Sequence, residues 1–326
     1  MMDAVLAERP GLLSDVLISR TIPSPNAPGE GEVTVRMVAS TINPSDAVTV
    51  SGAYGSRTQF PIGPGFEGVG IIEQVGPGVP EEAVGKRVLP IGSAGNWQEI
   101  KLTAYSWCIP VPDDITDTMA CFAYINPLTA WLMVERHCSA QTRHVAITGA
   151  TTTIAGHLAD LLSIRGIQPV GIIRGTPGST VSHPDQRSDV IETSDPYWAE
   201  QLARNHGRNF DLIFDCVGGQ LGGNLMRHLT PGGVLVHYGL LSGEPLPAEC
   251  FTNSEKKRVD MFRLRDTIHT HARESLPELF APVFEHLRAG RLHTEIAASI
   301  PLAGLPTMLK DHFPVRSGKV LISYAQ

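Results

Sequence analysis

This chain of 326 residues is poor in cysteine, in charge and in long apolar runs. Its five cysteines stand singly along the chain, so a disulfide framework is not expected and a reducing cytosol fits best. No stretch approaches the roughly 18 uninterrupted apolar residues of a membrane span. The first 16 residues carry acidic side chains early and lack the basic-then-apolar pattern of a signal peptide. We therefore expect a cytoplasmic protein that does not enter a membrane.

Basic residues are outnumbered, 26 against 33 acidic ones, which gives a formal net charge of −7. A general nucleic-acid binder needs a positive surface to displace counterions, so that function is not expected. Charged residues make up only 18% of the chain and hydrophobic residues 42%, which excludes disorder as the dominant state. The length allows one large domain or two ordinary ones, each with a buried core.

Two patterns divide the chain near residue 120. Before it, short β-rich runs alternate with Pro-Gly and Gly-Pro turn signals, which predicts an antiparallel barrel or sandwich. After it, apolar runs at 144–150, 169–174, 210–217 and 232–239 alternate with helical stretches. Apolar strands that alternate with helices are typical of a doubly wound parallel sheet, so we expect an α/β fold.

A glycine-bearing turn stands between the apolar run at 144–150 and the helical stretch that follows it. In this position backbone N–H groups and a helix N-terminus can bind a pyrophosphate. Gly149 opens the turn, while Thr153 and Ala155 stand where a GxGxxG fingerprint would have glycine. Candidate cofactor contacts in the turn are Gly149, Thr151, Thr152, Thr153, Ile154 and Ala155. A strand-turn-helix without a ligand remains an equal alternative for this motif alone.

The next apolar strand ends in Arg174, where an NAD site usually has Asp or Glu to bind the ribose hydroxyls. A guanidinium binds a 2′-phosphate through charge-assisted hydrogen bonds, whereas a carboxylate repels it. Arg174 therefore predicts NADP(H) as the cofactor in preference to NAD. The alternative is a solvated charge at the end of a strand.

With these segments in place, the chain resembles the medium-chain dehydrogenase/reductase superfamily, and within it the NADPH-dependent 2-enoyl thioester reductases. The motifs that carry the resemblance are INPSD at 42–46, SGAYG at 51–55, GPGFEGVG at 63–70, GNW at 95–97, INPLTAWLM at 125–133, IIR at 172–174, FDCVGG at 214–219, HYG at 237–239 and SGKVLISY at 317–324. The resemblance implies a GroES-like catalytic domain (1–120 and 295–326) interrupted by a Rossmann NADP-binding domain (121–294), with the active site in the cleft between them. It also implies a homodimer.

The resemblance further implies that no metal takes part. Zinc alcohol dehydrogenases of the superfamily have a cysteine where this chain reads Pro44-Ser45-Asp46, and a histidine where Phe66 precedes Glu67. Phenylalanine cannot bind a metal, and four closely spaced cysteines for a structural zinc are absent. Without a Lewis acid, reduction of an activated carbon–carbon double bond is easier than reduction of a ketone.

Family residues carry over to several positions. Tyr54 matches the tyrosine that acts as the catalytic acid, although it could be a turn residue that packs its ring. Asn126 matches a residue near the nicotinamide, although Asn before Pro is also a common helix start. The remaining cofactor contacts implied are Asn43 in the INPSD motif, Tyr238, Gly239 and Leu240 along the ribose, Phe262 at an aromatic wall, and Lys319 near a phosphate.

These expectations combine into a zinc-free, NADPH-dependent reductase of α,β-unsaturated carbonyl compounds, with a trans-2-enoyl thioester as the favoured substrate. Two alternatives remain open at this point. One is a quinone or alkenal reductase of the same superfamily. The other is a catalytically idle NADPH-binding protein, which the glycine-poor turn favours.

Overall fold

The computed structural model describes residues 1–55, 58–176, 179–207, 210–252, 256–312 and 318–325. The chain forms two compact units, one of residues 1–128 with 265–326 and one of residues 129–264. The second boundary differs from the predicted one at 295, because the segment 265–294 lies in the first unit. No helix among the described residues is long and apolar enough to cross a membrane.

The first unit is rich in antiparallel strands, as expected for residues 1–120. Its strands are β1 (Met2–Ala7), β2 (Leu17–Ile22), β3 (Glu32–Thr41), β4 (Gly68–Val75), β5 (Arg87–Pro90), β6 (Ile100–Ala104), β7 (Cys108–Pro110), β14 (Ile296–Pro301) and β15 (Lys319–Ser323). Among the described residues, β1 and β2 pair separately, and the other strands form one sheet in the order β14-β15-β3-β4-β5-β7, with β6 also paired to β3.

Alternating apolar residues place the core of this unit on one side of β3. Val33, Val35 and Met37 are at most 1% exposed and pack in one cluster with Trp97 and Ile322. The helices of the unit are α1 (Leu13–Val16), α2 (Pro44–Val50), α3 (Asp117–Cys121), α9 (Leu276–Arg288) and α10 (Leu305–His312). Two further helices cross the boundaries between the units, α4 (Ile125–His137) and α8 (Leu264–Thr270).

The second unit contains a parallel sheet of the doubly wound type. Its strands are β8 (Val145–Thr148), β9 (Val170–Ile173), β10 (Asp189–Glu192), β11 (Phe210–Asp215), β12 (Leu229–His237) and β13 (Arg258–Met261). Their order in space is β10-β9-β8-β11-β12-β13, and the described pairs are all parallel. The order reverses between β8 and β11, and ligands of such sheets bind at the carboxyl ends of the strands at this point. The predicted α/β fold with a Rossmann-type sheet is confirmed.

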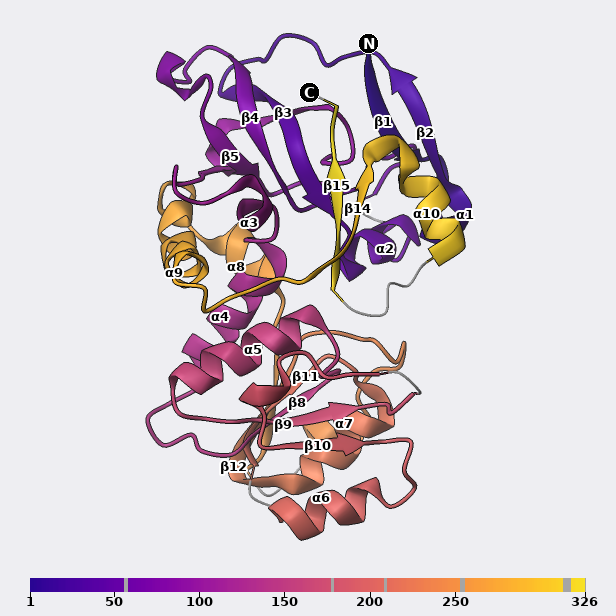
Figure 1. Cartoon of the computed structure of the whole chain (residues 1–326), viewed down its shortest axis with the longest axis vertical. Helices are drawn as coiled ribbons and strands as arrows, with labels where there is room; N and C mark the ends of the chain where they lie inside the picture. The colour runs from indigo at the N-terminus through magenta and orange to yellow at the C-terminus, as the bar shows by residue number, and fades with distance from the viewer. Residues whose placement is uncertain (56–57, 177–178, 208–209, 253–255, 313–317, 326) are drawn as a thin grey trace. The chain divides into compact units, whose positions relative to one another are not determined.

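Helices cover both faces of this sheet. Figure 1 shows α5 (Thr153–Ile164) on one side, with α6 (Trp198–His206) and α7 (Gly219–Leu225) on the other. This arrangement follows from right-handed crossovers between parallel strands. The described part of the crossover from β9 to β10 contains no α-helix, only the short 3₁₀ helix Pro184–Gln186.

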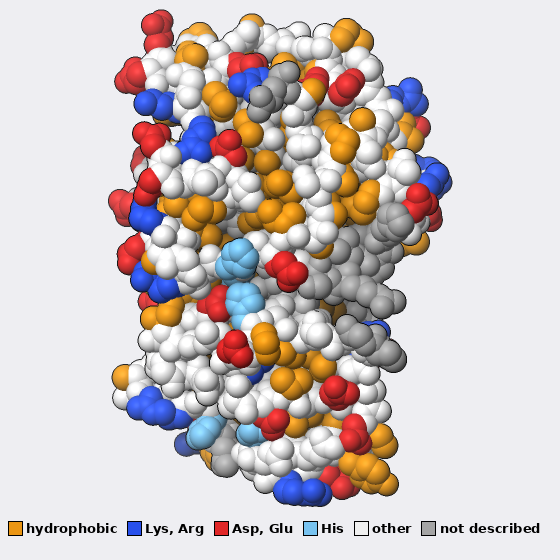
Figure 2. Space-filling model, viewed as in Figure 1, with side chains coloured by type: hydrophobic (Ala, Val, Ile, Leu, Met, Phe, Trp, Pro, Cys, Tyr) orange, Lys and Arg blue, Asp and Glu red, His pale blue; other side chains and the backbone are white. Residues whose placement is uncertain are grey.

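Figure 2 shows one face of the molecule, on which most charged side chains lie near the edges. Acidic and basic side chains alternate along its edges, and neither sign forms a continuous patch on that face.

Candidate functional site

The turn between β8 and α5 has the backbone geometry of a close approach. Gly149 adopts a φ of +58°, and a Cβ atom placed there would lie 2.6 Å from the Cys216 Sγ. Both observations require glycine at this position, because L-residues rarely adopt positive φ and the space is filled. The backbone N–H of Thr152 donates to the Gly149 carbonyl at 2.9 Å, which closes the turn before the helix.

Helix α5 presents free backbone donors at its start. The Thr152 hydroxyl caps the helix by accepting from the Ala155 N–H at 3.3 Å, and the Gly156 N–H donates to the Thr152 carbonyl. Among the described residues, no hydrogen-bond partner is found for the N–H groups of Thr153 and Ile154. Two unpaired donors at the positive end of a helix dipole fit a phosphate group. Thr152 thus acts as a helix cap, with its hydroxyl hydrogen still available to a ligand.

Arg174 follows β9 directly and its side chain is exposed. Its backbone carbonyl accepts from the Ser194 N–H at 2.9 Å, which fixes the strand end. Within the described chain, no ion pair or hydrogen bond involves its guanidinium. The backbone of Arg174 is thus fixed, while its guanidinium can bind a ligand. This arrangement fits the 2′-phosphate that the sequence predicts at this position.

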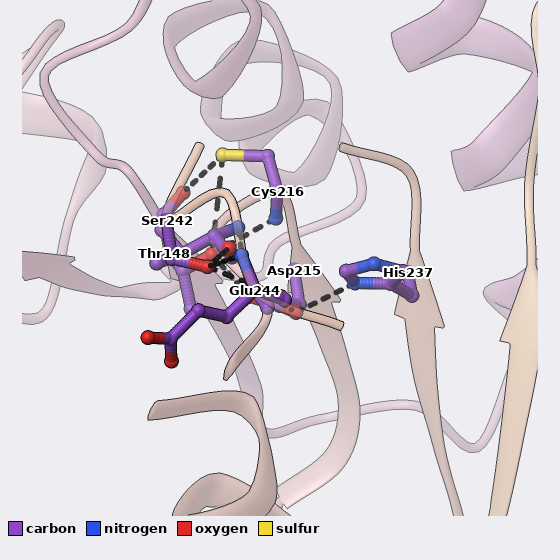
Figure 3. A network of polar contacts seen from close by, with 8 residues as sticks. Thr148, Asp215, Cys216, His237, Ser242 and Glu244 are labelled. Carbon is purple, nitrogen blue, oxygen red and sulfur yellow. Dashed lines mark hydrogen bonds and ion pairs between the residues drawn. The ribbon is translucent and has the colours of Figure 1, made fainter. Parts of the chain in front are cut away.

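The carboxyl ends of β8, β11 and β12 are joined by a buried polar network. Asp215 accepts from the Thr148 hydroxyl at 2.8 Å and lies 2.8 Å from Nδ1 of His237, as Figure 3 shows. It also accepts from the N–H groups of Val217 and Gly218. The Asp215 carboxylate therefore holds the turn after β11 and is unavailable to a ligand.

Tyr238 directly follows β12, as the sequence predicts. Its hydroxyl oxygen is buried and its phenol lies beside the Cys216 thiol, so burial raises the pKa of Tyr238 well above its usual value. The residue as a whole is partly exposed, and its contact with a cofactor ribose stays a prediction. Gly239 packs against the Cys216 backbone, and only Leu240 is exposed, at 51%.

Phe262 does not form an exposed wall. Its side chain is 5% exposed, and the Arg136 guanidinium lies 5.3 Å above the centre of its ring. The Arg136 side chain of α4 therefore packs on this ring, and the cofactor contact that the resemblance implies for Phe262 stays a prediction.

In the first unit, the INPSD motif belongs to a buried network. Asn43 donates from Nδ2 to Glu67 at 2.8 Å and accepts at Oδ1 from the Lys319 ammonium at 2.6 Å. Lys319 also donates to the Ile42 carbonyl and is 8% exposed. Both side chains have their hydrogen bonds satisfied inside the unit. The contact of Asn43 and Lys319 with the cofactor, which the resemblance implies, stays a prediction.

Two carboxyl groups complete this network. Asp46 accepts from the N–H groups of Asn43 at 2.7 Å and Phe66 at 3.1 Å. Glu67 accepts from the N–H groups of Tyr124 and Ile125 at 3.0 and 2.7 Å, and so binds the start of α4. Burial raises the pKa of Asp46 to about 7 and also raises the pKa of Glu67. Burial lowers the pKa of Lys319, and the nearby Glu67, Asp46 and Cys121 oppose this shift.

The two predicted catalytic residues lie in the first unit with free side chains. Tyr54 is 45% exposed in the turn after α2, close to the undescribed residues 56–57. Asn126 is the second residue of α4 and partly buried. Among the described residues, neither side chain has a hydrogen-bond partner, so both can bind a ligand.

Comparisons with known proteins cover both units. A family model described as an alcohol dehydrogenase GroES-like domain matches residues 29–116, and one described as a zinc-binding dehydrogenase matches residues 188–309. The chain belongs to the medium-chain dehydrogenase/reductase superfamily. This assignment agrees with the GroES-like sheet in the first unit and the Rossmann-type sheet in the second.

Relatives in the superfamily carry two kinds of name. The mitochondrial enoyl-[acyl-carrier-protein] reductase of Bos taurus is 29% identical over 291 residues, 85% of this chain and 76% of the relative. A provisionally named NADPH:quinone reductase of Bacillus thuringiensis has a similar structure, with a TM-score of 0.88, 29% identity and 99% of each chain covered. A solved complex of Etr1p with NADP and crotonyl-CoA has a TM-score of 0.81 at 21% identity, with 99% of each chain covered, and shows the shared fold.

The zinc ligands of the superfamily have no equivalent cluster in the described residues. Among them, no group of three or more His, Cys, Asp or Glu side chains is arranged to hold a metal ion. Phe66 stands beside Glu67, and the Glu67 carboxylate is occupied by the start of α4.

Arg187 was not predicted from the sequence as a residue of the site. Arg187, in the crossover before β10, is buried beneath the Gly149 turn and donates to its carbonyls. A lone arginine in an irregular segment gives no sequence signal. The replacement of two fingerprint glycines by Thr153 and Ala155 was the only sequence feature to indicate that another group supports the Gly149 turn.

Proposed function

We propose that the chain is an NADP(H)-dependent reductase that saturates the carbon–carbon double bond of α,β-unsaturated carbonyl compounds, with 2-enoyl thioesters favoured. The assignment of NADP(H) is supported by the two unpaired N–H groups at the start of α5 together with the guanidinium of Arg174, which has no partner in the described chain. The thioester rests on the names of the enoyl reductase relatives and on Tyr54.

The residues of the second unit fit a phosphorylated dinucleotide. The N–H groups of Thr153 and Ile154 would bind the pyrophosphate, and Arg174 would bind the 2′-phosphate. The bound dinucleotide supplies a hydride, which is added to the β-carbon of the substrate. Leu240, exposed at the end of β12, would present an apolar surface to the ribose.

The residues of the first unit would handle the proton. The Tyr54 hydroxyl would donate a hydrogen bond to the substrate carbonyl and deliver the proton to the α-carbon, directly or through water. The Asn126 amide would orient the phenol or the substrate. The product gains one hydride and one proton, so no other oxidant or reductant is needed.

The test is the loss of NADPH absorbance with crotonyl-CoA and, separately, with 1,4-benzoquinone. We expect faster oxidation with crotonyl-CoA. Preference for the quinone would assign the second candidate, a quinone reductase, which the Bacillus thuringiensis relative favours. Tight NADPH binding without oxidation by either acceptor would leave a binding protein and refute the proposal.

A further inference from the structure

A buried cation lies directly beneath the proposed cofactor turn. Arg187 is 8% exposed and comes shortly before β10, directly after the 3₁₀ helix Pro184–Gln186 of the crossover from β9. Its Nη2 donates to the carbonyls of Ala155 at 3.0 Å and Ala150 at 3.5 Å, and its Nε donates to the Ser182 carbonyl at 3.2 Å. The guanidinium therefore joins the turn, the first turn of α5 and the crossover.

Ser182 makes a second set of contacts from the same crossover. Its N–H donates to the Ala150 carbonyl at 2.9 Å and its hydroxyl to the Thr151 carbonyl at 3.2 Å. The carbonyl groups of Ala150 and Thr151 in the turn are therefore already bonded within the protein. The N–H groups of Thr153 and Ile154 remain available to a ligand.

The charge of Arg187 is not balanced inside the protein. Among the described residues it forms no ion pair, and its Nη1 has no hydrogen-bond partner. Tyr238 and Asp160 act on it without a hydrogen bond, and the Asp160 carboxylate is bonded to Nδ1 of His183 at 2.7 Å. Burial lowers the pKa of Arg187 to about 10, so the side chain stays protonated at neutral pH. An unpaired buried charge is costly, and an anionic ligand nearby would offset the cost.

We propose that Arg187 is a positioning residue for the cofactor pyrophosphate, which shapes the glycine-poor turn through its carbonyls and attracts the phosphates by its buried charge. This inference rests on the proposed function. The pyrophosphate is common to NADPH and NADH, so Arg187 should affect the affinity for both nucleotides equally. Arg174, in contrast, should affect only the affinity for NADPH, which has the 2′-phosphate.

The experiment separates charge from hydrogen bonding with Arg187→Gln and Arg187→Lys. Gln can still donate to a turn carbonyl but has no charge, whereas Lys keeps the charge. Dissociation constants for NADPH and NADH are measured by fluorescence titration of the whole chain, at low and high salt. For Arg187→Gln we expect both constants to rise about tenfold, with an unchanged ratio and a weaker salt dependence, because one buried charge at short range is removed. For Arg187→Lys we expect both to stay within about threefold of the unmodified protein.

Arg143→Gln is the matched control. Arg143 also donates to two backbone carbonyls of the second unit, those of Ala140 at 2.8 Å and Thr142 at 2.9 Å, but before β8 at the opposite end of the strand. Its substitution should leave both dissociation constants unchanged, and melting temperatures without ligand report whether each variant is folded.

The outcomes are distinct. Equal losses in the Gln and Lys variants, or unchanged binding in the Gln variant, would overturn the role of the charge while the proposed function stands. If Arg187→Gln does not fold, the Lys variant and the salt dependence of the unmodified protein decide the same point. An unmodified protein that binds neither nucleotide would refute the proposed function, and this inference with it.

Discussion

Replacing Asp46 by Asn should change how the stability of the protein depends on pH. The Asp46 carboxyl is fully buried and shares a network with Glu67 and one cation, Lys319. With all three groups ionised the network would have a net charge of −1, so burial favours the uptake of a proton. This is the physical reason why the pKa of Asp46 rises to about 7.

The direction follows from proton linkage. An unfolded aspartate titrates near 3.8, so between 3.8 and about 7 the folded state holds a proton that the unfolded state has released. The free energy of unfolding therefore falls as the pH rises through this window, by up to about 1.4 kcal/mol per unit for one proton. From about pH 5 to about pH 6.5 the contribution is about 2 kcal/mol.

The assay is urea denaturation of the unmodified protein and of Asp46→Asn at several pH values in this window. The Asn side chain offers one acceptor to the two N–H groups of Asn43 and Phe66, so at the acidic end of this window the variant should be less stable by about 1–3 kcal/mol. The difference between the two proteins should shrink as the pH rises, because only the unmodified protein loses a proton.

Asp114→Asn serves as the control. The Asp114 carboxylate is exposed and bonded to Arg288, which lowers its pKa, so it does not titrate in this window. A constant difference between Asp46→Asn and the unmodified protein across the window would refute the assignment of the bound proton to this network.

Three further substitutions test the site. Arg174→Ala should raise the KM for NADPH by about tenfold or more and leave that for NADH unchanged, because charge-assisted bonds to the 2′-phosphate are lost; equal increases would contradict its role. Tyr54→Phe should lower kcat at least about 100-fold at unchanged NADPH affinity, and equal turnover would remove the phenol from proton transfer. Gly149→Ala should lower the free energy of unfolding by about 1–3 kcal/mol, since its Cβ would meet the Cys216 thiol at positive φ. An unchanged melting temperature would contradict the requirement for glycine at position 149.

The alternation of strands and helices was readable from the sequence because apolar periodicity reports local structure. The helical stretch predicted from residue 154 is α5, and the apolar runs before and after it are β8 and β9. The packing partner of an amphipathic helix is a long-range property, however, and periodicity does not specify it. The predicted Rossmann domain of residues 121–294 therefore includes α9, whereas α9 lies in the first unit.

The place of a residue in the fold was predicted best where backbone geometry decides it. Gly149 lies in the predicted turn between a strand and a helix, and Arg174 directly follows a strand, while their contacts with a cofactor stay predictions. The surroundings of a side chain were less accessible, as Lys319 shows. The sequence cannot tell that this lysine is enclosed by residues some 280 positions earlier in the chain.

The position of β15 bears on the order in which the protein acquires its structure during synthesis. This strand pairs with β3 and β14, and Lys319 at its start completes the network around Asn43. The strands from β8 to β13 are contiguous in the chain and need no later segment for their sheet. Because domains fold as units, we expect the Rossmann-type unit to be assembled first on the ribosome. The GroES-like unit, although its residues emerge earlier, would wait for the final strand.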